Sequence, residues 1–411
     1  MLATYDIDLL DLVRTNPKEL TVYFVGVEGE RIRRNYMALI KHASDQTINA
    51  DADAAAGPSL VPIIPEITAQ STSYTFRSPT GLLNATQFTQ TSLILVAMAA
   101  VADMRANGLV QNDAMFAGHS LGEYCALGAL SNTFTLENLL DIVFYRGLLM
   151  QSAVPRDAQA RSEFGMTAVD PSRVGESFSE DALLRTIDAI CNGSPGLLQI
   201  VNYNVRGQQY VASGTLTNLA VLRLVLDEMA ASGVPADADI ELHVGQLVGR
   251  ILTEPVSTVP VRGVATIPLR GIDVPFHSQQ LIDSVAEFRS ALLTKINCDT
   301  VSPDLLYGRY VPNLTAVPFE VTSGYFEMVH AATRSAIAGD VLRNWSDDDL
   351  RDPAEKKRLA VVLLIELLSY QLAAPVQWIR TQDCLFNAVE VQRVVEIGPS
   401  PVLCGMAAKT L

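Results

Sequence analysis

Apolar and polar positions in the first 150 residues follow two different periods. Short runs of β-branched and aromatic residues, bounded by glycine or proline, predict buried strands at residues 20–26 and 114–118. The mostly apolar stretch over residues 86–107 predicts a long buried helix. The second strand runs directly into a glycine turn and a further helix. This order of strand, sharp turn and helix is typical of an α/β domain.

The pattern changes near residue 165, where four predicted strands enclose two predicted helices in the order of a split βαβ unit. The strands lie at residues 164–169, 197–203, 208–212 and 266–271, and the helices at residues 180–191 and 216–232. We therefore predict an inserted ferredoxin-like subdomain at residues 165–271. The main domain, residues 1–164 and 272–411, is expected to be α/β-hydrolase-like with a parallel sheet.

The other segments of the predicted main domain are helices, one strand and two connections. The helices are expected at residues 279–296, 355–373 and 401–409, the strand at 393–397, a surface loop at 51–73 and an acidic linker at 345–353. Within the small subdomain, residues 237–260 are ambiguous and are expected to form a loop with one helical turn.

Composition narrows the classes of function. Of 411 residues, 49% are hydrophobic and 18% are charged, which supports a large core and excludes general disorder. A net charge of −15 argues against nucleic-acid binding as the main role. Five scattered cysteines without a C-x-x-C pair favour reduced thiols over disulfides or a metal site. No membrane span or secretory signal is expected, so we predict a cytoplasmic protein.

The first candidate for chemistry is the pentapeptide Gly118-His119-Ser120-Leu121-Gly122, between a predicted strand and a predicted helix. Glycines at its two ends permit a strained turn in which the Ser120 Oγ projects into open space. The Leu121 amide at the start of the helix can then stabilise an oxyanion. This setting favours a catalytic serine over a tight turn that is capped by a serine side chain.

A nucleophilic serine needs a general base, and the chain has five histidines. His119 adjoins the serine and is expected to point away from its Oγ. His277 follows a predicted strand end and precedes a helix, a location that resembles the Ser120 turn and favours a functional loop. We therefore prefer His277 as the base, with an ordinary structural histidine as the alternative.

Arg146 lies on a predicted helix with mostly apolar flanks, where a guanidinium needs a bidentate partner. Two interpretations stay open on these residues alone. The partner is either a carboxylate of the chain itself or the carboxylate of a substrate.

Several motifs resemble a known family. Residues 118–124 (GHSLGEY), 144–147 (FYRG), 202–204 (NYN) and 275–278 (PFHS) occur in the order and spacing of malonyl-CoA:ACP acyltransferases. More narrowly, the chain resembles the malonyl/palmitoyl transferase domain of fungal-type fatty acid synthase, and the segments that carry this likeness are 85–90 (ATQFTQ), 201–205 (VNYNV), 312–316 (PNLTA) and 394–401 (VVEIGPSP). The resemblance covers essentially the whole chain.

The resemblance also concerns the way the chain is assembled. Residues 355–411 resemble the opening of the α chain of two-chain fungal synthases, whereas the rest resembles the end of the β chain. We therefore expect β-chain-like and α-chain-like segments on one chain, joined either naturally or by engineering.

The resemblance implies a Ser–His dyad, with Ser120 as the acyl-accepting nucleophile and His277 as its base. It implies that Arg146 pairs with the malonyl carboxylate. A carbonyl of Gln371 is expected to orient His277, so that a neutral acceptor fixes the imidazole tautomer.

The family likeness also suggests the remaining groups of the site. Phe276 and Asn202 are expected to bind substrate, Phe276 as a wall against branched extenders. With Leu121 as one oxyanion donor, the second is expected from a backbone amide near Gly26 and Val27, with the Gln90 side chain as a less favoured choice. Gln90 is also placed among the substrate-binding residues.

The implied reaction is ping-pong transfer of malonyl from CoA to an acyl carrier protein, and of palmitoyl from the carrier back to CoA. CoA thioesters and phosphopantetheine are then substrates, and no tightly bound cofactor or metal is expected. Expected partners are the carrier protein, docking near Arg156, Arg161 and Lys409, and other domains of a synthase, without nucleic acid or membrane. A serine esterase or thioesterase and a vestigial structural module remain as alternatives.

Overall fold

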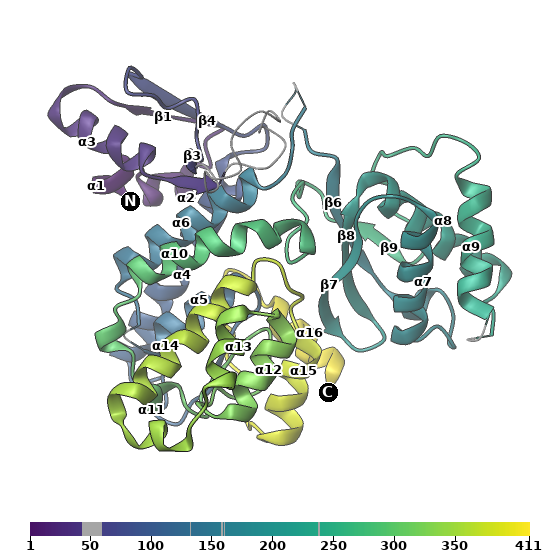
Figure 1. Ribbon diagram of the computed structural model, residues 1–411. Helices are drawn as coiled ribbons and strands as arrows, with labels where there is room; N and C mark the ends of the chain where they lie inside the picture. Colours follow the sequence, from purple (N-terminus) through teal and green to yellow (C-terminus); the bar gives the residue numbers. More distant parts are fainter. Residues whose placement is uncertain (43–59, 132, 158, 160, 237–238) are drawn as a thin grey trace.

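The computed structural model describes residues 1–42, 60–131, 133–157, 159, 161–236 and 239–411. Figure 1 shows a large, mostly helical body beside a smaller body in which helices lie on one side of a sheet. The chain leaves the large body before β6 and returns to it after β9, so the smaller body is formed by one continuous stretch of sequence.

The smaller body contains a four-stranded sheet in the order β7-β8-β6-β9, with every neighbouring pair antiparallel. Its strands are β6 (Phe164–Val169), β7 (Leu198–Val205), β8 (Gln209–Thr215) and β9 (Thr266–Pro268). Along the chain they alternate with α7 (Glu180–Gly193) and α8 (Leu216–Ser232) as β6-α7-β7-β8-α8-β9, the order of a split βαβ unit.

Helices α7 and α8 pack against one face of this sheet, and a further helix lies against them (Figure 1). The amphipathic α7 begins at Ser179, whose Oγ accepts a hydrogen bond from the Ala182 amide at 3.1 Å. The third helix, α9 (Ile240–Ile251), packs against α7 and α8 and shares their apolar core. The expectation of a loop with one helical turn at 237–260 is therefore wrong over residues 240–251, because the side chains at Ile240, Val244 and Leu247 form a buried stripe. Residues 252–260 form turns and loop, as expected. Residues 237–238 lie outside the described residues.

The opposite face of the sheet turns toward the large body. Met166, Val201 and Val211 form a buried cluster there, against which Phe276 packs from the large body. The strand β7 is also joined to the segment around Val376, because the Tyr203 amide donates to the Val376 carbonyl at 3.0 Å and the Val376 amide donates back to the Val201 carbonyl at 2.9 Å.

The large body is built mainly from helices around one continuous apolar core. Its principal helices are α4 (Thr86–Ala106), α5 (Leu121–Leu130), α6 (Leu136–Ser152), α10 (Val285–Lys295), α12 (Ser323–Thr333), α13 (Ala336–Arg343), α14 (Pro353–Tyr370), α15 (Trp378–Asp383) and α16 (Val402–Thr410). The other α-helices of this body are α1 (Leu2–Tyr5), α2 (Leu9–Thr15), α3 (Gly26–Met37) and α11 (Pro303–Leu306).

The strands of the large body are short and form separate pairs. β1 (Glu19–Tyr23) pairs antiparallel with β4 (Ser73–Arg77), and β2 (Ile40–His42) pairs antiparallel with β3 (Leu60–Pro62). In the described part of the chain, the prediction of a parallel sheet in the main domain is met only by β5 (Phe116–Ala117) and β10 (Tyr310–Val311).

The strand predicted at residues 393–397 does not form, although its apolar pattern suits one. Val394 and Val395 are exposed, and Glu396 takes another role. Its carboxylate accepts hydrogen bonds from the amides of Leu403 and Cys404 at 2.9 and 2.8 Å, in the first turn of α16. The segment therefore serves the start of that helix, where a carboxylate is favourable.

The two predicted connections have mixed outcomes. The part of the expected loop 51–73 up to residue 59 lies outside the described residues, and the rest contains β3 and the first residue of β4. The expected acidic linker at 345–353 contains a short 3-10 helix, Asp347–Arg351, that leads directly into α14.

The helix α4 is long and apolar enough, by length and composition, to cross a membrane. Phe88, Ile94 and Val101 are buried along it, and it packs against α6 and α5. The buried core helix of a soluble protein meets the same two criteria, so length and composition alone are weak evidence for a membrane span.

Candidate active site

Ser120 lies at a sharp turn between β5 and α5, where it is the residue before the first helical turn. Its φ of 53° and ψ of −113° are strained for a residue with a side chain. The turn closes tightly, since a Cβ added to Gly118 would overlap the backbone of Gly122. The predicted strand, glycine turn and helix are thus all present around the serine.

Asn313 holds this turn from the neighbouring chain segment. It follows β10, the parallel partner of β5. Its Oδ1 accepts a hydrogen bond from the Ser120 amide at 2.7 Å, and its Nδ2 donates to the Gly118 carbonyl at 2.6 Å. Both polar ends of one side chain therefore fix the strained backbone. Sequence reasoning missed this residue as part of the site, although the segment 312–316 carried part of the family likeness.

His277 meets Ser120 across 157 positions of sequence. The Ser120 Oγ lies 2.7 Å from His277 Nε2, and His277 Nδ1 lies 2.7 Å from the backbone carbonyl of Gln371. Because a carbonyl can only accept, Nδ1 carries the proton and Nε2 is free to accept the serine proton. Burial lowers the pKa of His277 to about 3, with the positive charge of Arg146 as the next cause. The imidazole is therefore neutral near pH 7.

The Arg146 guanidinium lies in the same buried region, and only 2% of the residue is exposed. Its Nη1 donates to Gln90 Oε1 at 2.8 Å and its Nη2 donates to the side-chain Oε1 of Gln371 at 2.9 Å. The guanidinium carbon stands 5.3 Å from the centre of the Tyr124 ring, and Nε has no hydrogen-bond partner in the described part of the chain. Of the two interpretations left open by the sequence, a salt bridge within the chain is therefore not found among the described residues.

Gln371 connects these groups. It is fully buried at the end of α14, and its backbone carbonyl and side-chain oxygen contact His277 and Arg146. Its side-chain Nε2 donates to the Ser120 carbonyl at 3.0 Å and also to the carboxylate of Glu123. One residue thus contacts the candidate nucleophile, its base and the cation.

Glu123 and Tyr310 complete the buried network and were missed by sequence reasoning. Glu123 is 1% exposed, and its Oε1 accepts a hydrogen bond from the Tyr310 hydroxyl at 2.5 Å. Burial raises the pKa of Glu123 to about 7, against the opposing effect of the hydrogen bonds from Tyr310 and Gln371. The signal was present in the motif GHSLGEY, whose glutamate lies three positions after the serine and therefore on the same side of the helix.

The expected oxyanion donors separate into two groups. The Leu121 amide at the start of α5 makes no hydrogen bond to any described residue, so it is available to an oxyanion. Gly26 and Val27 instead begin α3, where both are exposed, and Figure 1 shows α3 well apart from α5. The prediction of a donor at these two residues is therefore wrong in this structure, because the turn after β1 directs them to solvent.

Gln90 takes part in the site through its oxygen, which accepts from Arg146 as described. Its Nε2 lies 3.7 Å from the Met150 sulfur, a weak acceptor. Gln90 therefore fits a role in holding the guanidinium, and its amide nitrogen has no strong partner that would compete with a ligand.

The other expected residues border the network without joining it. Phe276 directly precedes His277 and is half-buried between the main core and the cluster on the small sheet. Asn202 is buried on β7, at the bridge to Val376. His119 points away from the serine, as predicted, and its Nε2 lies 2.9 Å from Asn204 Oδ1.

Two of the three cations expected to receive a carrier protein are already paired. Arg156 forms a two-armed contact with Asp273 at 2.5 and 3.1 Å, and Arg161 pairs with Asp157 at 2.8 Å. Lys409 is exposed near the end of α16.

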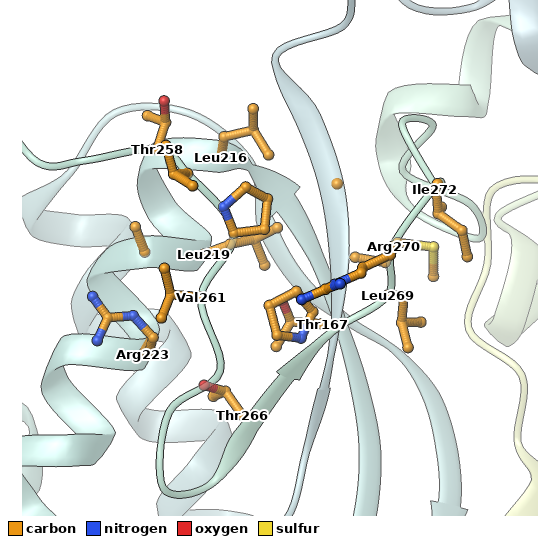
Figure 2. Close-up of a pocket in the computed structure, with 17 residues that line it drawn as sticks. Thr167, Leu216, Leu219, Arg223, Thr258, Val261, Thr266, Leu269, Arg270 and Ile272 are labelled. Carbon is orange, nitrogen blue, oxygen red and sulfur yellow. The ribbon is translucent and has the colours of Figure 1, made fainter. Parts of the chain in front are cut away.

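The structure also has a cavity of about 310 Å³ in the smaller body, between β6, α8 and the chain before and after β9. Figure 2 shows the Arg270 side chain between Thr167 and Ile272, with Leu216 and Thr258 at the other end of the cavity. Ser120, Arg146 and His277 do not line this cavity, so it is separate from the network described above.

The arrangement as a whole combines three chemical capacities. A hydroxyl in contact with a neutral imidazole can be activated as a nucleophile. An unused amide at a helix start can stabilise a developing oxyanion. A buried guanidinium held by two neutral amides can still bind a carboxylate. Among the described residues, no three histidine, cysteine, aspartate or glutamate side chains are grouped so that they would hold a metal ion.

Comparison with known proteins shows the family to which the chain belongs. The family model described as acyl transferase domain matches residues 1–336. Fatty acid synthase 2 of Mycosarcoma maydis is 45% identical over 98% of this chain and 11% of its own length. Fatty acid synthase subunit beta of Saccharomyces cerevisiae is 41% identical over 83% of this chain and 17% of its own length. The chain therefore spans less than a fifth of either relative.

Solved structures support the fold. The acyl-carrier-protein-S-malonyltransferase from Bartonella henselae aligns with a TM-score of 0.51 at 23% sequence identity, covering 82% of this chain and 78% of that one. The two proteins thus share an α/β fold. From the family match and the fungal relatives, we conclude that the chain belongs to the acyl transferase domain family.

Proposed function

We propose that this acyltransferase moves malonyl from CoA to an acyl carrier protein, and palmitoyl from the carrier back to CoA, through an acyl-serine at Ser120. The observation that carries the proposal is the 2.7 Å contact between Ser120 Oγ and His277 Nε2 beside the buried Arg146. The fungal fatty acid synthase relatives and the malonyltransferase named in the solved structure support the substrate class.

In the proposed first step, the Ser120 Oγ attacks the thioester carbonyl while His277 Nε2 accepts the serine proton. The Leu121 amide donates to the oxyanion of the tetrahedral intermediate, with Gln90 Nε2 as the candidate for a second donor. When the carbon–sulfur bond breaks, the proton passes from His277 to the CoA thiolate. The phosphopantetheine thiol of the carrier then attacks the acyl-serine by the same steps in reverse order.

Arg146 is proposed to bind the malonyl carboxylate. Each Nη carries two N–H groups, and each uses one of them on a glutamine oxygen. The remaining N–H groups can therefore bind a carboxylate in a two-armed contact without displacing Gln90 or Gln371. Phe276 is proposed as the wall beside the reacting acyl group, and Asn202 as a more distant part of the binding region.

The domain organisation is part of the same proposal. We assign residues 165–271 to an inserted ferredoxin-like subdomain and residues 1–164 and 272–411 to an α/β-hydrolase-like main domain, which is supported by the strand order of the small sheet. The match of a single fungal protein over 98% of the chain supports a natural joining of the two segments. The proposed setting is a cytoplasmic synthase whose other domains, with the carrier protein, are the partners.

The competing proposals predict different fates for the acyl group. A serine esterase or thioesterase would transfer it to water, and a vestigial module would not accept it. The intact contact of Ser120 with His277, and the cation placed beside it, favour an active transferase over either alternative.

Incubation with malonyl-CoA is expected to add a single malonyl group, about 86 Da, to Ser120, because thioester attack leaves the acyl group on the nucleophile. Intact-protein and peptide mass spectrometry measure the adduct, and Ser120→Ala is the control that should carry none. Adduct that persists until a carrier thiol is supplied supports transfer. Rapid loss of the adduct to water would support the esterase, and absence of any adduct would support the vestigial module.

Arg146→Ala is expected to reduce malonyl transfer by at least about 100-fold and palmitoyl transfer far less, because only malonyl presents a carboxylate to the guanidinium. The two rates are measured as kcat/KM with malonyl-CoA and palmitoyl-CoA. Arg289→Ala, which removes an arginine that pairs with Glu366 and not with a group of the candidate site, serves as a control for general destabilisation. Equal losses for the two substrates in Arg146→Ala would contradict a selective role.

The rate of malonylation of Ser120 is expected not to decrease as the pH falls from 7 to 5. The pKa of His277 is lowered to about 3, so the imidazole remains neutral and able to accept a proton throughout this range. The test is kcat/KM from CoA release at several pH values, with folding followed by circular dichroism. A decrease with a midpoint near 6.5, the usual pKa of histidine, would show that burial does not control this base.

A further inference from the structure

Glu123 is a buried acid for which the proposed mechanism has no use. Both of its carboxylate oxygens accept hydrogen bonds, one from the Tyr310 hydroxyl and one from Gln371 Nε2. It lies in the first turn of α5, three residues after Ser120. A carboxylate that is 1% exposed needs a compensating charge or a proton, because burial penalises an isolated anion.

The buried guanidinium of Arg146 also needs a compensating charge. The side-chain amide of Gln371 joins Arg146 to Glu123. Gln371 accepts from Arg146 Nη2 through Oε1 and donates to Glu123 through Nε2. The amide dipole is thus oriented with its oxygen toward the cation and its nitrogen toward the carboxylate. This is the orientation that both charges favour, so guanidinium, amide and carboxylate form a bridged ion pair.

The other titratable groups that face Glu123 are uncharged near pH 7. Tyr124 on α5, Tyr310 on β10 and Tyr325 on α12 surround it, and burial raises the pKa of each phenol above its usual value. Arg146 on α6 is therefore the charged group that faces Glu123 among the described residues. The pair is electrically neutral only when Glu123 is ionised.

We propose that Glu123 is a positioning residue that balances the charge of Arg146, ionised when the site is empty or holds a neutral acyl chain and protonated when it holds malonyl. The inference rests on the proposed function and deepens it. A malonyl carboxylate brings a second negative charge to Arg146, and one proton from solvent then moves to a carboxylate oxygen of Glu123. That proton returns to solvent when malonyl leaves on the carrier thiol.

This exchange explains how one site takes both a charged and an uncharged acyl group. A buried guanidinium beside a palmitoyl chain would be an unpaired charge if it had no partner of its own. Glu123 supplies that partner through Gln371, so Arg146 need not leave the site when palmitoyl binds. The pKa of Glu123, raised by burial to about 7, makes both protonation states accessible near neutral pH.

The unmodified 411-residue chain provides the primary test. Ser120 acylation rates at low substrate concentration are measured between pH 6 and 8 with malonyl-CoA, palmitoyl-CoA and acetyl-CoA. Around a pKa of about 7, the ionised fraction of Glu123 rises about tenfold over this range. The palmitoyl-to-malonyl rate ratio is therefore expected to rise by at least about tenfold. A ratio that stays constant from pH 6 to 8 would overturn the proposal.

Glu123→Gln keeps the shape of the side chain and removes its charge. We expect malonylation to stay within about threefold of the unmodified chain and palmitoylation to fall at least about tenfold, with the pH dependence of their ratio abolished. Glu366→Gln is the matched control, since Glu366 is also a buried acid. Its carboxylate pairs with Arg289 at 2.7 Å and accepts a hydrogen bond from Ser335, and neither partner belongs to the candidate site. Equal losses for both substrates in Glu123→Gln would indicate a merely structural role and contradict the proposal.

Tyr310→Phe gives an independent readout if Glu123→Gln does not fold. It removes a hydrogen bond that favours the ionised carboxylate, so the pKa of Glu123 rises. The midpoint of the rate ratio should therefore move to higher pH, and an unmoved midpoint would contradict the proposal.

If the unmodified chain accepts no palmitoyl at any pH, the palmitoyl part of the proposed function fails, and the acetyl-to-malonyl ratio then tests Glu123 in its place.

Discussion

The buried residue Gln371 makes four hydrogen bonds to other groups of the candidate site. Its carbonyl accepts from His277, its side-chain oxygen accepts from Arg146, and its side-chain nitrogen donates to the Ser120 carbonyl and to Glu123. His277, Arg146 and Glu123 are buried, and Gln371 supplies each of them with a hydrogen-bond partner inside the protein. The positions of the candidate nucleophile, its candidate base and the cation are therefore coupled, and the segment that supplies Gln371 is an integral part of the candidate site.

The fold was predictable where a local pattern decides the outcome. The glycine turn at Ser120 and the strands and helices of the small sheet follow from short-range sequence signals, and they form at nearly the expected bounds. Residues 393–397 have the pattern of a strand, but no neighbouring strand pairs with them and Glu396 binds the start of α16 instead. Pairing partners of strands depend on tertiary structure, which a local apolar pattern does not determine.

The sequence predicted the reactive groups of the candidate site, but not all of the residues that hold these groups in place. Ser120, His277 and Arg146 have distinctive chemistry, and the family likeness supplied Gln371. Asn313 and Glu123 support them through hydrogen bonds between segments up to about 250 positions apart. The spacing in GHSLGEY places Glu123 near Ser120, but it does not identify Gln371 as the partner of Glu123. The misplaced donors at Gly26 and Val27 show the same limit, because the exposure of a turn depends on how the elements around it pack.

The proposed transfer requires that the acyl-serine at Ser120 and the guanidinium of Arg146 hold the same malonyl group. A crystal structure of the chain carrying malonyl on Ser120 tests this most directly. We predict that both carboxylate oxygens lie about 2.8 Å from Arg146 nitrogens, with Gln371 still bound to His277. A malonyl carboxylate directed into solvent, with Arg146 bound only to Gln90 and Gln371, would contradict the account.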